Sequence, residues 1–213
     1  MQRQAIADSR PAVGCGHGAD RLAHAASDLS CENQSGGQPA RFVSFGSAND
    51  GFHMTADLFA EAPGPLRETM GEGAVLLRGK ALPLEDEVIA ALAAITARAP
   101  FRNMVTPGGF VMSVAMTNCG AAGWVTDRKG YRYDRNDPET GKPWPDMPDS
   151  FLRLAAGAAA EADYQDFTPD ACLINRYEPG ARLSLHQDRN ERDFAEPIVS
   201  VSLGLPAVFS SGA

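Results

Sequence analysis

Hydrophobic and polar positions follow a regular period only from about residue 73 onward. A short apolar run predicts a strand over residues 74–78. Val88, Leu92 and Ile95 then recur at helical spacing behind an acidic first turn, which predicts a helix over residues 83–98. The ordered part of the chain is therefore expected to begin with one strand followed by one helix.

Further along, the pattern predicts a second helix and a series of strands. An alanine-rich stretch over residues 150–162 follows Asp149, a good helix-capping residue. Strands are expected over residues 110–117, 170–177, 181–188 and 197–205, with a proline-rich loop over 136–148. Helices first and closely spaced strands later indicate an α+β fold, with helices packed outside a jelly roll or β-sandwich. Such a roll needs about eight strands, so we expect its C-terminal strands to be missing.

Residues 1–53 lack this periodicity and are rich in Ala, Gly, Ser, Asp and Asn. We predict that they form a disordered leader. Met54 opens a segment that looks like a protein start, so an extension from a misassigned start codon is a second explanation. Residues 54–213 are then expected to form one incomplete domain.

Composition narrows the class of protein. The chain has 213 residues, of which 44% are hydrophobic, and no apolar run approaches the roughly 20 residues that span a bilayer. Its four cysteines are widely spaced, which predicts a cytoplasmic protein and argues against a disulfide framework or a structural zinc site. The net charge of −8 excludes nucleic-acid binding by bulk electrostatics, so any such contact requires a local patch.

One local patch fits that requirement. Residues 127–135 are expected to form a hairpin in which basic residues outnumber two acids. The basic residues are Arg128, Lys129, Arg132 and Arg135. The tyrosines of the hairpin, with Trp124 nearby, would be able to stack on bases. The alternative is a solvated hairpin whose aromatic side chains lie against the core.

His186 and Asp188 carry the most informative chemistry. On the strand predicted over residues 181–188, side chains two apart project from the same face, so the imidazole and the carboxylate can converge. Together they supply two corners of the facial triad that holds non-haem Fe(II). The triad needs a second histidine, but the other histidines lie in the unpatterned N-terminal segment. They are His17, His24 and His53. The alternative is a hydrogen-bonded structural pair.

Asn175 and Tyr177 close the strand that precedes this pair. A tight turn over residues 178–180 can place both side chains beside His186. There they would offer a hydrogen-bond donor and a hydroxyl next to a candidate metal. The alternative is that they cap the turn and pack against the sheet edge.

Several segments of the chain closely resemble the bacterial AlkB family of alkylated-DNA repair dioxygenases. The likeness runs from about Met54 to Phe209 with little or no gap. Its most specific segments are residues 103–120, 123–124, 143–148, 169–177, 183–188 and 197–206.

The resemblance implies a double-stranded β-helix with Fe(II) and 2-oxoglutarate at its centre. His186 and Asp188 match two iron ligands, and Asn175 and Tyr177 match positions that hydrogen-bond 2-oxoglutarate. The implied reaction consumes O₂ and 2-oxoglutarate, hydroxylates an N-methyl group on 1-methyladenine or 3-methylcytosine, and releases formaldehyde. That methyl group lies on the Watson–Crick edge, so the base has to be extruded from the stack.

The resemblance also implies residues for the nucleic acid. Trp124 matches the residue that, with the iron-ligating histidine, sandwiches the extruded base, and Tyr131 and Tyr133 match the loop that grips the DNA backbone. The nucleotide-recognition face is matched by Thr106, Met112 and Met116. For the two methionines, core filling on a strand is the alternative. The implied partner is alkylated single- or double-stranded DNA, with RNA not distinguished, and the implied state is a monomer without membrane contact.

The sequence departs from the family pattern in two places. In the family, a further iron histidine and the arginines that bind 2-oxoglutarate follow the Gly-Leu-Pro strand, and these 213 residues contain no counterpart. Asn190 stands where the family often has an acid that contacts the base, although Glu191 is beside it. Two hypotheses follow: a repair dioxygenase whose sequence is incomplete, or a truncated non-catalytic chain that binds nucleic acid weakly. For these residues alone we expect little or no turnover.

Overall fold

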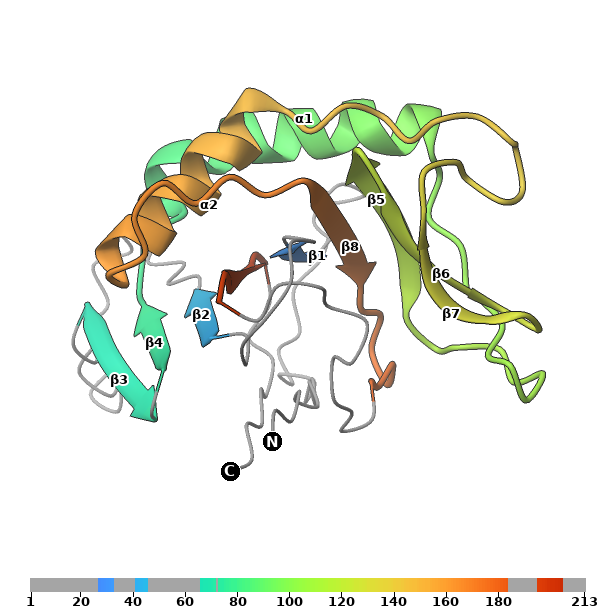
Figure 1. Ribbon diagram of the computed structural model, residues 1–213, viewed down its shortest axis with the longest axis horizontal. Helices are drawn as coiled ribbons and strands as arrows, with labels where there is room; N and C mark the ends of the chain where they lie inside the picture. The colour runs from blue at the N-terminus through green and yellow to red at the C-terminus, as the bar shows by residue number, and fades with distance from the viewer. Residues whose placement is uncertain (1–26, 33–40, 46–65, 72, 184–194, 205–213) are drawn as a thin grey trace, which may run out of the picture.

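The computed structural model describes residues 27–32, 41–45, 66–71, 73–183 and 195–204. Within these ranges, two helices lie across one face of a large sheet, and a small hairpin stands beyond one edge (Figure 1). Helix α1 spans Glu85–Arg98 and follows a 3-10 turn, η1, at Leu82–Leu84. Helix α2 spans Asp149–Glu161. The described part is thus a sheet covered by helices on one side, in agreement with an α+β class.

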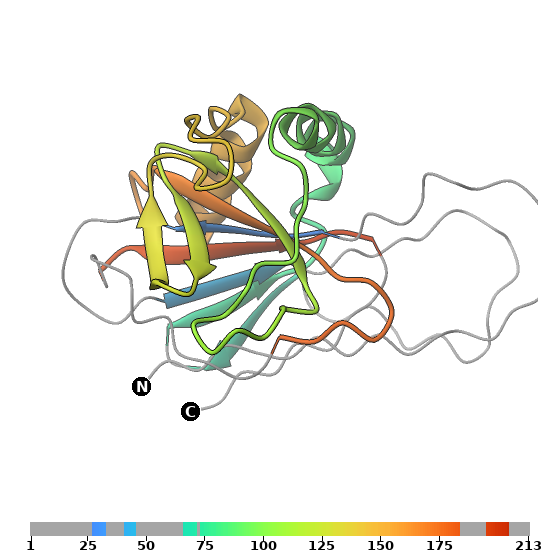
Figure 2. The same cartoon turned by 90° about the vertical axis from the view of Figure 1, so that its right-hand side faces the viewer.

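The main sheet has seven strands among the described residues, in the order β3-β4-β2-β9-β1-β8-β5. These strands are β1 (Ser27–Glu32), β2 (Arg41–Phe45), β3 (Arg67–Gly71), β4 (Ala74–Leu77), β5 (Ala115–Gly120), β8 (Ala171–Arg176) and β9 (Pro197–Ser202). Strand β2 pairs in parallel with β4 and β9, whereas the other pairs are antiparallel. Two further strands, β6 (Gly123–Asp127) and β7 (Gly130–Asp134), form the separate hairpin. Figure 2 shows this hairpin from its own side, with both helices above it.

The helices and the sheet enclose an apolar core. Val88, Leu92 and Ile95 on α1 are buried and share one cluster with Ile174 of β8 and Val199 of β9. The predicted helical stripe is therefore confirmed. Burying such a stripe against a sheet supplies most of the free energy that holds a surface helix in place.

Most predicted elements are confirmed, with small shifts at their ends. The strands expected over 74–78 and 170–177 correspond to β4 and β8, and the hairpin over 127–135 corresponds to β6 and β7. The strand expected over 197–205 corresponds to β9, which ends at Ser202. No helix in the described part of the chain is long and apolar enough to cross a membrane.

Three details of the prediction are wrong. Helix α2 starts at Asp149 and is preceded by Pro148, and no side chain caps it. The Asp149 carboxylate lies instead in the first turn, where it complements the positive end of the helix dipole. Residues 181–183 do not form a strand, and the rest of the range 181–188 lies outside the described residues.

The third error concerns residues 110–117, for which alternation predicts one continuous strand. The regular strand starts only at Ala115, because the residues before it fold back into a narrow loop. The Thr106 N–H donates to the Phe110 carbonyl at 2.8 Å, and the Met112 N–H donates to the Met104 carbonyl at 2.9 Å. These local bonds occupy the backbone groups that a longer strand would need.

Strands β1 and β2 lie inside the segment 1–53, for which the sequence predicts disorder. Strand β1 pairs with β8 and β9, and β2 pairs with β4 and β9. Backbone pairing satisfies N–H and C=O groups without any side-chain periodicity, so the pattern gave no sign of these strands. The remainder of the segment lies outside the described residues, as does Met54, and the division into a leader and a domain stays a prediction.

The proline-rich loop after β7 is tied to the sheet by Arg102. Its Nη2 atom lies 2.6 Å from Asp137 Oδ1, and both side chains are largely buried, at 18% and 6% exposed. The Arg102 guanidinium also lies over the Trp144 ring, 5.4 Å from the centroid. Burial alone would raise the pKa of Asp137, but hydrogen bonds from Arg102 and from the Glu139 N–H lower it below its usual value. The carboxylate is thus stabilised in its charged form.

Replacing Gly123 with alanine is expected to destabilise the protein. A methyl group there would meet Trp144 Cε2 and Nε1 at 2.6 Å and Asn118 Cβ at 2.7 Å, and both neighbours are buried. We expect Gly123→Ala to lower the free energy of unfolding by about 1–3 kcal/mol. Gly157→Ala in α2 is the control, because its methyl would meet only Lys80 Cε, at an ordinary contact distance of 4.0 Å, and it should raise stability by about 0.5–1 kcal/mol. Urea unfolding followed by circular dichroism measures both, and equal effects would contradict this packing.

The lowered pKa of Asp137 predicts a pH-dependent contribution to stability. A carboxyl group with a lowered pKa stabilises the fold above its ordinary value of 3.8, and this contribution is lost as the pH falls through the native value. We expect Asp137→Asn to cost on the order of 2 kcal/mol at pH 7. The difference from the unmodified chain should shrink below pH 3.8. Urea titrations across this range test it, and a difference that does not change with pH would contradict it.

Candidate functional site

The aromatic residues expected to meet nucleic acid lie on one face of the β6–β7 hairpin. Trp124 is the Cα partner of Tyr133, and Thr126 is the partner of Tyr131. Because side chains alternate between the faces of a strand, these four residues share a face. Trp124 and Tyr131 are diagonal neighbours whose rings stack, with centroids 5.7 Å apart and planes at 27°. Tyr131 is 51% exposed, so this face presents an aromatic surface and does not simply line the core.

Arg132 projects from the opposite face of the hairpin and is paired with acids. Its Nη2 atom lies 3.0 Å from Asp127 Oδ2, and its Nε atom lies 3.5 Å from Asp134 Oδ2. The hydrogen bond from Arg132, together with one from the Lys129 N–H, lowers the pKa of Asp127. The same bond to Asp127 raises the pKa of Arg132. The charge of Arg132 is therefore compensated within the hairpin.

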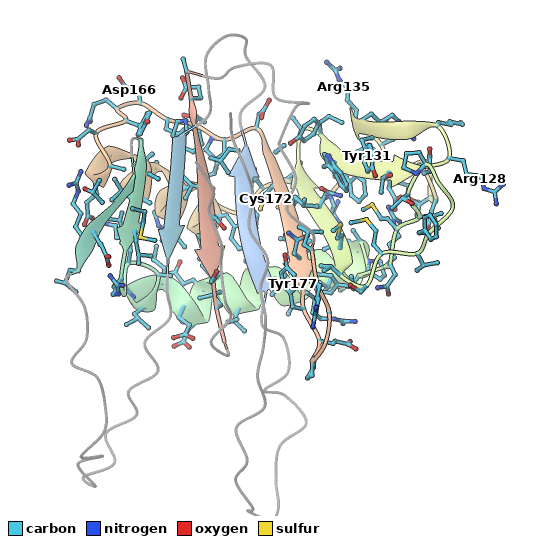
Figure 3. The ribbon with its side chains drawn as sticks, turned by 90° about the horizontal axis from the view of Figure 1, so that it is seen from below. Arg128, Tyr131, Arg135, Asp166, Cys172 and Tyr177 are labelled. Carbon is cyan, nitrogen blue, oxygen red and sulfur yellow. The ribbon has the colours of Figure 1, made fainter. Side chains whose placement is uncertain are left out.

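The other cations of the hairpin region face solvent. Arg128, Lys129 and Arg135 are exposed, at the turn and at the end of β7. Figure 3 shows the Arg128 and Arg135 side chains pointing away from the sheet, on the same part of the molecule as Tyr131. This arrangement places exposed positive charge next to the aromatic surface. Together they match what contact with a phosphate backbone and a base would require.

Four of the predicted site residues meet in a second apolar cluster, on the face of the sheet opposite the helices. Met116 is a buried member, and Met112, Trp124 and Tyr177 pack against it. Figure 3 shows Tyr177 at the end of β8, on the side of the sheet toward the hairpin. The cluster therefore brings together residues expected to bind the substrate and a residue expected to bind the cosubstrate.

Asn175 lies beside this cluster. It is the Cα partner of Met116 across the β5–β8 pair and is only 4% exposed. Its Oδ1 atom is buried and has no hydrogen-bond partner among the described residues. A buried polar atom without a partner is costly, and the two ends of a side-chain amide are exchanged by a simple flip. Asn175 is therefore suited to hydrogen-bond a polar group brought by a ligand.

Met116 and Thr106 each have a structural role. Met116 is 1% exposed, which favours the alternative that its side chain fills the core. The Thr106 hydroxyl accepts a hydrogen bond from the Phe110 N–H at 3.2 Å, so it holds the loop together. At the tip of the same loop Phe110 is 76% exposed. Thr106 thus stabilises the loop, whether or not it also contacts a nucleotide.

The candidate metal ligands His186 and Asp188 lie outside the described residues, as do Asn190 and Glu191. Among the residues that are described, no group of three His, Cys, Asp or Glu side chains could hold a metal ion. The arrangement of His186 and Asp188 around iron is therefore a prediction from the sequence.

Two polar residues on or next to β5 were missed as site residues. The Ser113 hydroxyl donates to the Arg182 carbonyl at 2.9 Å and accepts from the Arg182 N–H at 3.0 Å, which fixes the chain shortly before His186. Asn118 makes a similar pair of bonds with Trp124. Asn118 shares a face with Val114 and Met116, so a polar residue in an apolar alternation was the available sign.

Comparison with known families gives one match over most of the described chain. Residues 73–213 match the model of the 2OG-Fe(II) oxygenase superfamily. The matched range contains α1, α2 and strands β4 to β9, together with all the site residues expected from the sequence.

Curated proteins give the same picture. The chain is 58% identical over 156 residues to the alpha-ketoglutarate-dependent dioxygenase AlkB of Escherichia coli (strain K12), covering 73% of this chain and 72% of that protein. An AlkB homolog of Caulobacter vibrioides is 47% identical over 125 residues, covering 59% and 55%. The nucleic acid dioxygenase ALKBH1 of Homo sapiens is 32% identical over 89 residues, which cover 42% of this chain and 23% of that protein.

Proposed function

The chain belongs to the AlkB family of the 2OG-Fe(II) oxygenase superfamily, and we propose that it removes N-linked methyl groups from alkylated bases in nucleic acid. It is an oxidoreductase of the dioxygenase type, and its family uses Fe(II), 2-oxoglutarate and O₂. The observation that carries the proposal is the gathering of Trp124, Met112 and Tyr177 in one cluster, with Asn175 beside it. Residues that we expect to bind the base and the cosubstrate thereby pack against one cluster.

We infer that the domain is a double-stranded β-helix whose iron is held by His186 and Asp188 among its ligands. Bound Fe(II), with 2-oxoglutarate and O₂, supplies the oxidant that hydroxylates an N-methyl carbon. The unsatisfied polar end of the Asn175 side chain supports a cosubstrate site there, because a flip of the amide turns Nδ2 to the same space, where it can donate to a carboxylate. Tyr177 would orient the same molecule from the end of β8.

The protein's own residues would bind and orient the damaged base. Trp124 offers an indole face for stacking, and Tyr131 covers part of that ring and extends the aromatic surface. Arg128, Lys129 and Arg135 would hold the flanking phosphates without reading sequence. A base with a methyl on its Watson–Crick edge pairs poorly, so it is extruded more easily than an intact base.

We propose alkylated DNA, in single or double strands, as the substrate, with 1-methyladenine and 3-methylcytosine as the lesions. RNA is a second candidate substrate, because the similar human protein is named a nucleic acid dioxygenase. We further propose that the chain acts as a monomer in the cytoplasm.

Turnover tests the proposed function. We expect little or no turnover from residues 1–213 alone. A chain extended by the family's further iron histidine and 2-oxoglutarate-binding arginines should release formaldehyde and succinate in equal amounts from Fe(II), 2-oxoglutarate and an oligonucleotide carrying 1-methyladenine. Asp188→Asn should reduce the rate more than about 100-fold, because it removes a charged metal ligand. Asp166→Asn is the matched control, since Figure 3 shows Asp166 at the end of the sheet away from Tyr177, and asparagine tolerates its positive φ of 60°.

Two results would contradict the proposal. The first is the absence of formaldehyde from the extended chain on both DNA and RNA, even when the oligonucleotide binds. The second is an equal loss of rate in the Asp188 and Asp166 variants.

Salt dependence of binding tests the role of the hairpin cations. Replacing Arg128 and Lys129 together with glutamine should weaken binding to methylated single-stranded DNA. It should also reduce the slope of log K against log salt by about 1.4, because each phosphate that a cation neutralises on a single strand contributes about 0.7. Arg67→Gln in β3 is the control, because β3 lies at the opposite edge of the sheet (Figure 1). The Arg67 side chain is 45% exposed. Fluorescence anisotropy at several salt concentrations measures the slopes, and an unchanged slope in the double variant would contradict the role.

A further inference from the structure

We propose that Asn118 is a positioning residue that fixes Trp124 in the place from which its ring stacks on an extruded base. The inference rests on the proposed function, because it explains how the base-stacking residue is held. It concerns a residue on the main sheet that has no direct access to a substrate. Asn118 is 0% exposed, so its effect has to pass through the groups that it touches.

Both polar ends of the Asn118 side chain bind the same residue. Its Nδ2 group donates to the Trp124 carbonyl at 3.0 Å, and its Oδ1 atom accepts from the Trp124 N–H at 2.9 Å. A primary amide has the same donor and acceptor groups as a peptide bond. Asn118 therefore does for Trp124 what the backbone of a neighbouring strand would do.

Strand geometry explains why Trp124 needs this partner. In an antiparallel pair, opposed residues alternate between those that exchange backbone hydrogen bonds and those that do not. The N–H and C=O of Trp124 point to Asn118, so the Trp124–Tyr133 pair is of the second kind. Strands β5 and β6 belong to separate sheets. Without Asn118, the backbone of Trp124 would face buried surroundings with no partner of its own.

The surroundings of Asn118 leave Trp124 little freedom to move. Gly123 lacks a side chain, and a methyl group at that position would lie only 2.7 Å from Asn118 Cβ, so the close approach of the two strands depends on glycine. Tyr131 stacks on the Trp124 ring from the same hairpin. The backbone of Trp124 is thus held by Asn118 and its ring by Tyr131. A stacking residue held in this way needs little reordering when a base arrives.

The test compares Asn118→Ala with Thr117→Val in the full chain. Thr117 is the adjacent residue of β5, is equally buried, and donates its hydroxyl to the Ala99 carbonyl at 2.7 Å on the helix side. Each variant loses buried hydrogen bonding between a side chain and the backbone, but only Asn118→Ala removes bonds to Trp124. Hydrogen exchange at the Trp124 amide and the near-ultraviolet circular dichroism of the Trp124–Tyr131 stack are read without any turnover. Binding of an oligonucleotide carrying 1-methyladenine is measured alongside.

In Asn118→Ala, the amide hydrogen of Trp124 is expected to exchange with solvent at least tenfold faster. The amide hydrogen of Val125 should stay protected, because Val125 pairs with Arg132 of β7. The variant should also alter the near-ultraviolet signal and bind the methylated oligonucleotide at least tenfold more weakly. Thr117→Val should lose thermal stability without these three changes. Equal exchange, spectra and binding in the two variants would overturn the proposal.

Two features keep the test decisive. If Asn118→Ala does not fold, slow exchange of the Trp124 amide in the unmodified chain is still required, and fast exchange there would overturn the proposal. Asn118→Ser, which cannot reach both backbone groups at once, then replaces the alanine variant. Failure of the proposed function would appear as absent formaldehyde release from the extended chain, whereas the exchange and spectral results concern Asn118 alone.

Discussion

The pairing of β5 with β8 decides which side chains of this protein can meet. Cys119 lies opposite Cys172 and Met116 opposite Asn175, so each strand sends alternate residues to the helices and to the second cluster. A slip of one residue would exchange the two faces completely. The need to bury apolar side chains against the helices therefore also determines which side chains lie on the opposite face of the sheet. The candidate site depends on a register that is set by the core.

The hairpin that carries the aromatic surface depends on the same register. Asn118 points away from the helices because Thr117 and Cys119 point toward them, and only from that face can its amide reach Trp124. Gly123 allows the close contact, and Trp144 packs against it from the proline-rich loop. The core thus fixes the orientation of β5, and β5 fixes the position of the hairpin. The hairpin in turn positions the aromatic surface that would contact a base.

The sequence predicts the parts of this arrangement that rest on local periodicity. The helix over 83–98 and the strand β8 follow from apolar spacing, which reports burial directly. The prediction of a strand from residue 110 is wrong, because local backbone hydrogen bonds around Thr106 outweigh the alternation of apolar and polar residues there. Strands β1 and β2 are set by pairing with distant partners, for which no local pattern exists. For the site, motif resemblance identified Trp124 and Tyr131, but their stacking and shared face required the register of the hairpin.

The charge of the protein constrains how it can hold a nucleic acid. With a net charge of −8, long-range attraction to a polyanion is unfavourable, and Arg132 is already compensated by Asp127 and Asp134. Among the described residues near Tyr131, the exposed cations Arg128, Lys129 and Arg135 remain to contact phosphates. Affinity must therefore come in large part from stacking, which is available only to a base that has left the helix. An intact base leaves the stack at a higher cost in free energy than a methylated base that cannot pair. Weak electrostatic attraction thus improves discrimination between methylated and intact bases, because little binding free energy is gained before the damaged base reaches the aromatic face.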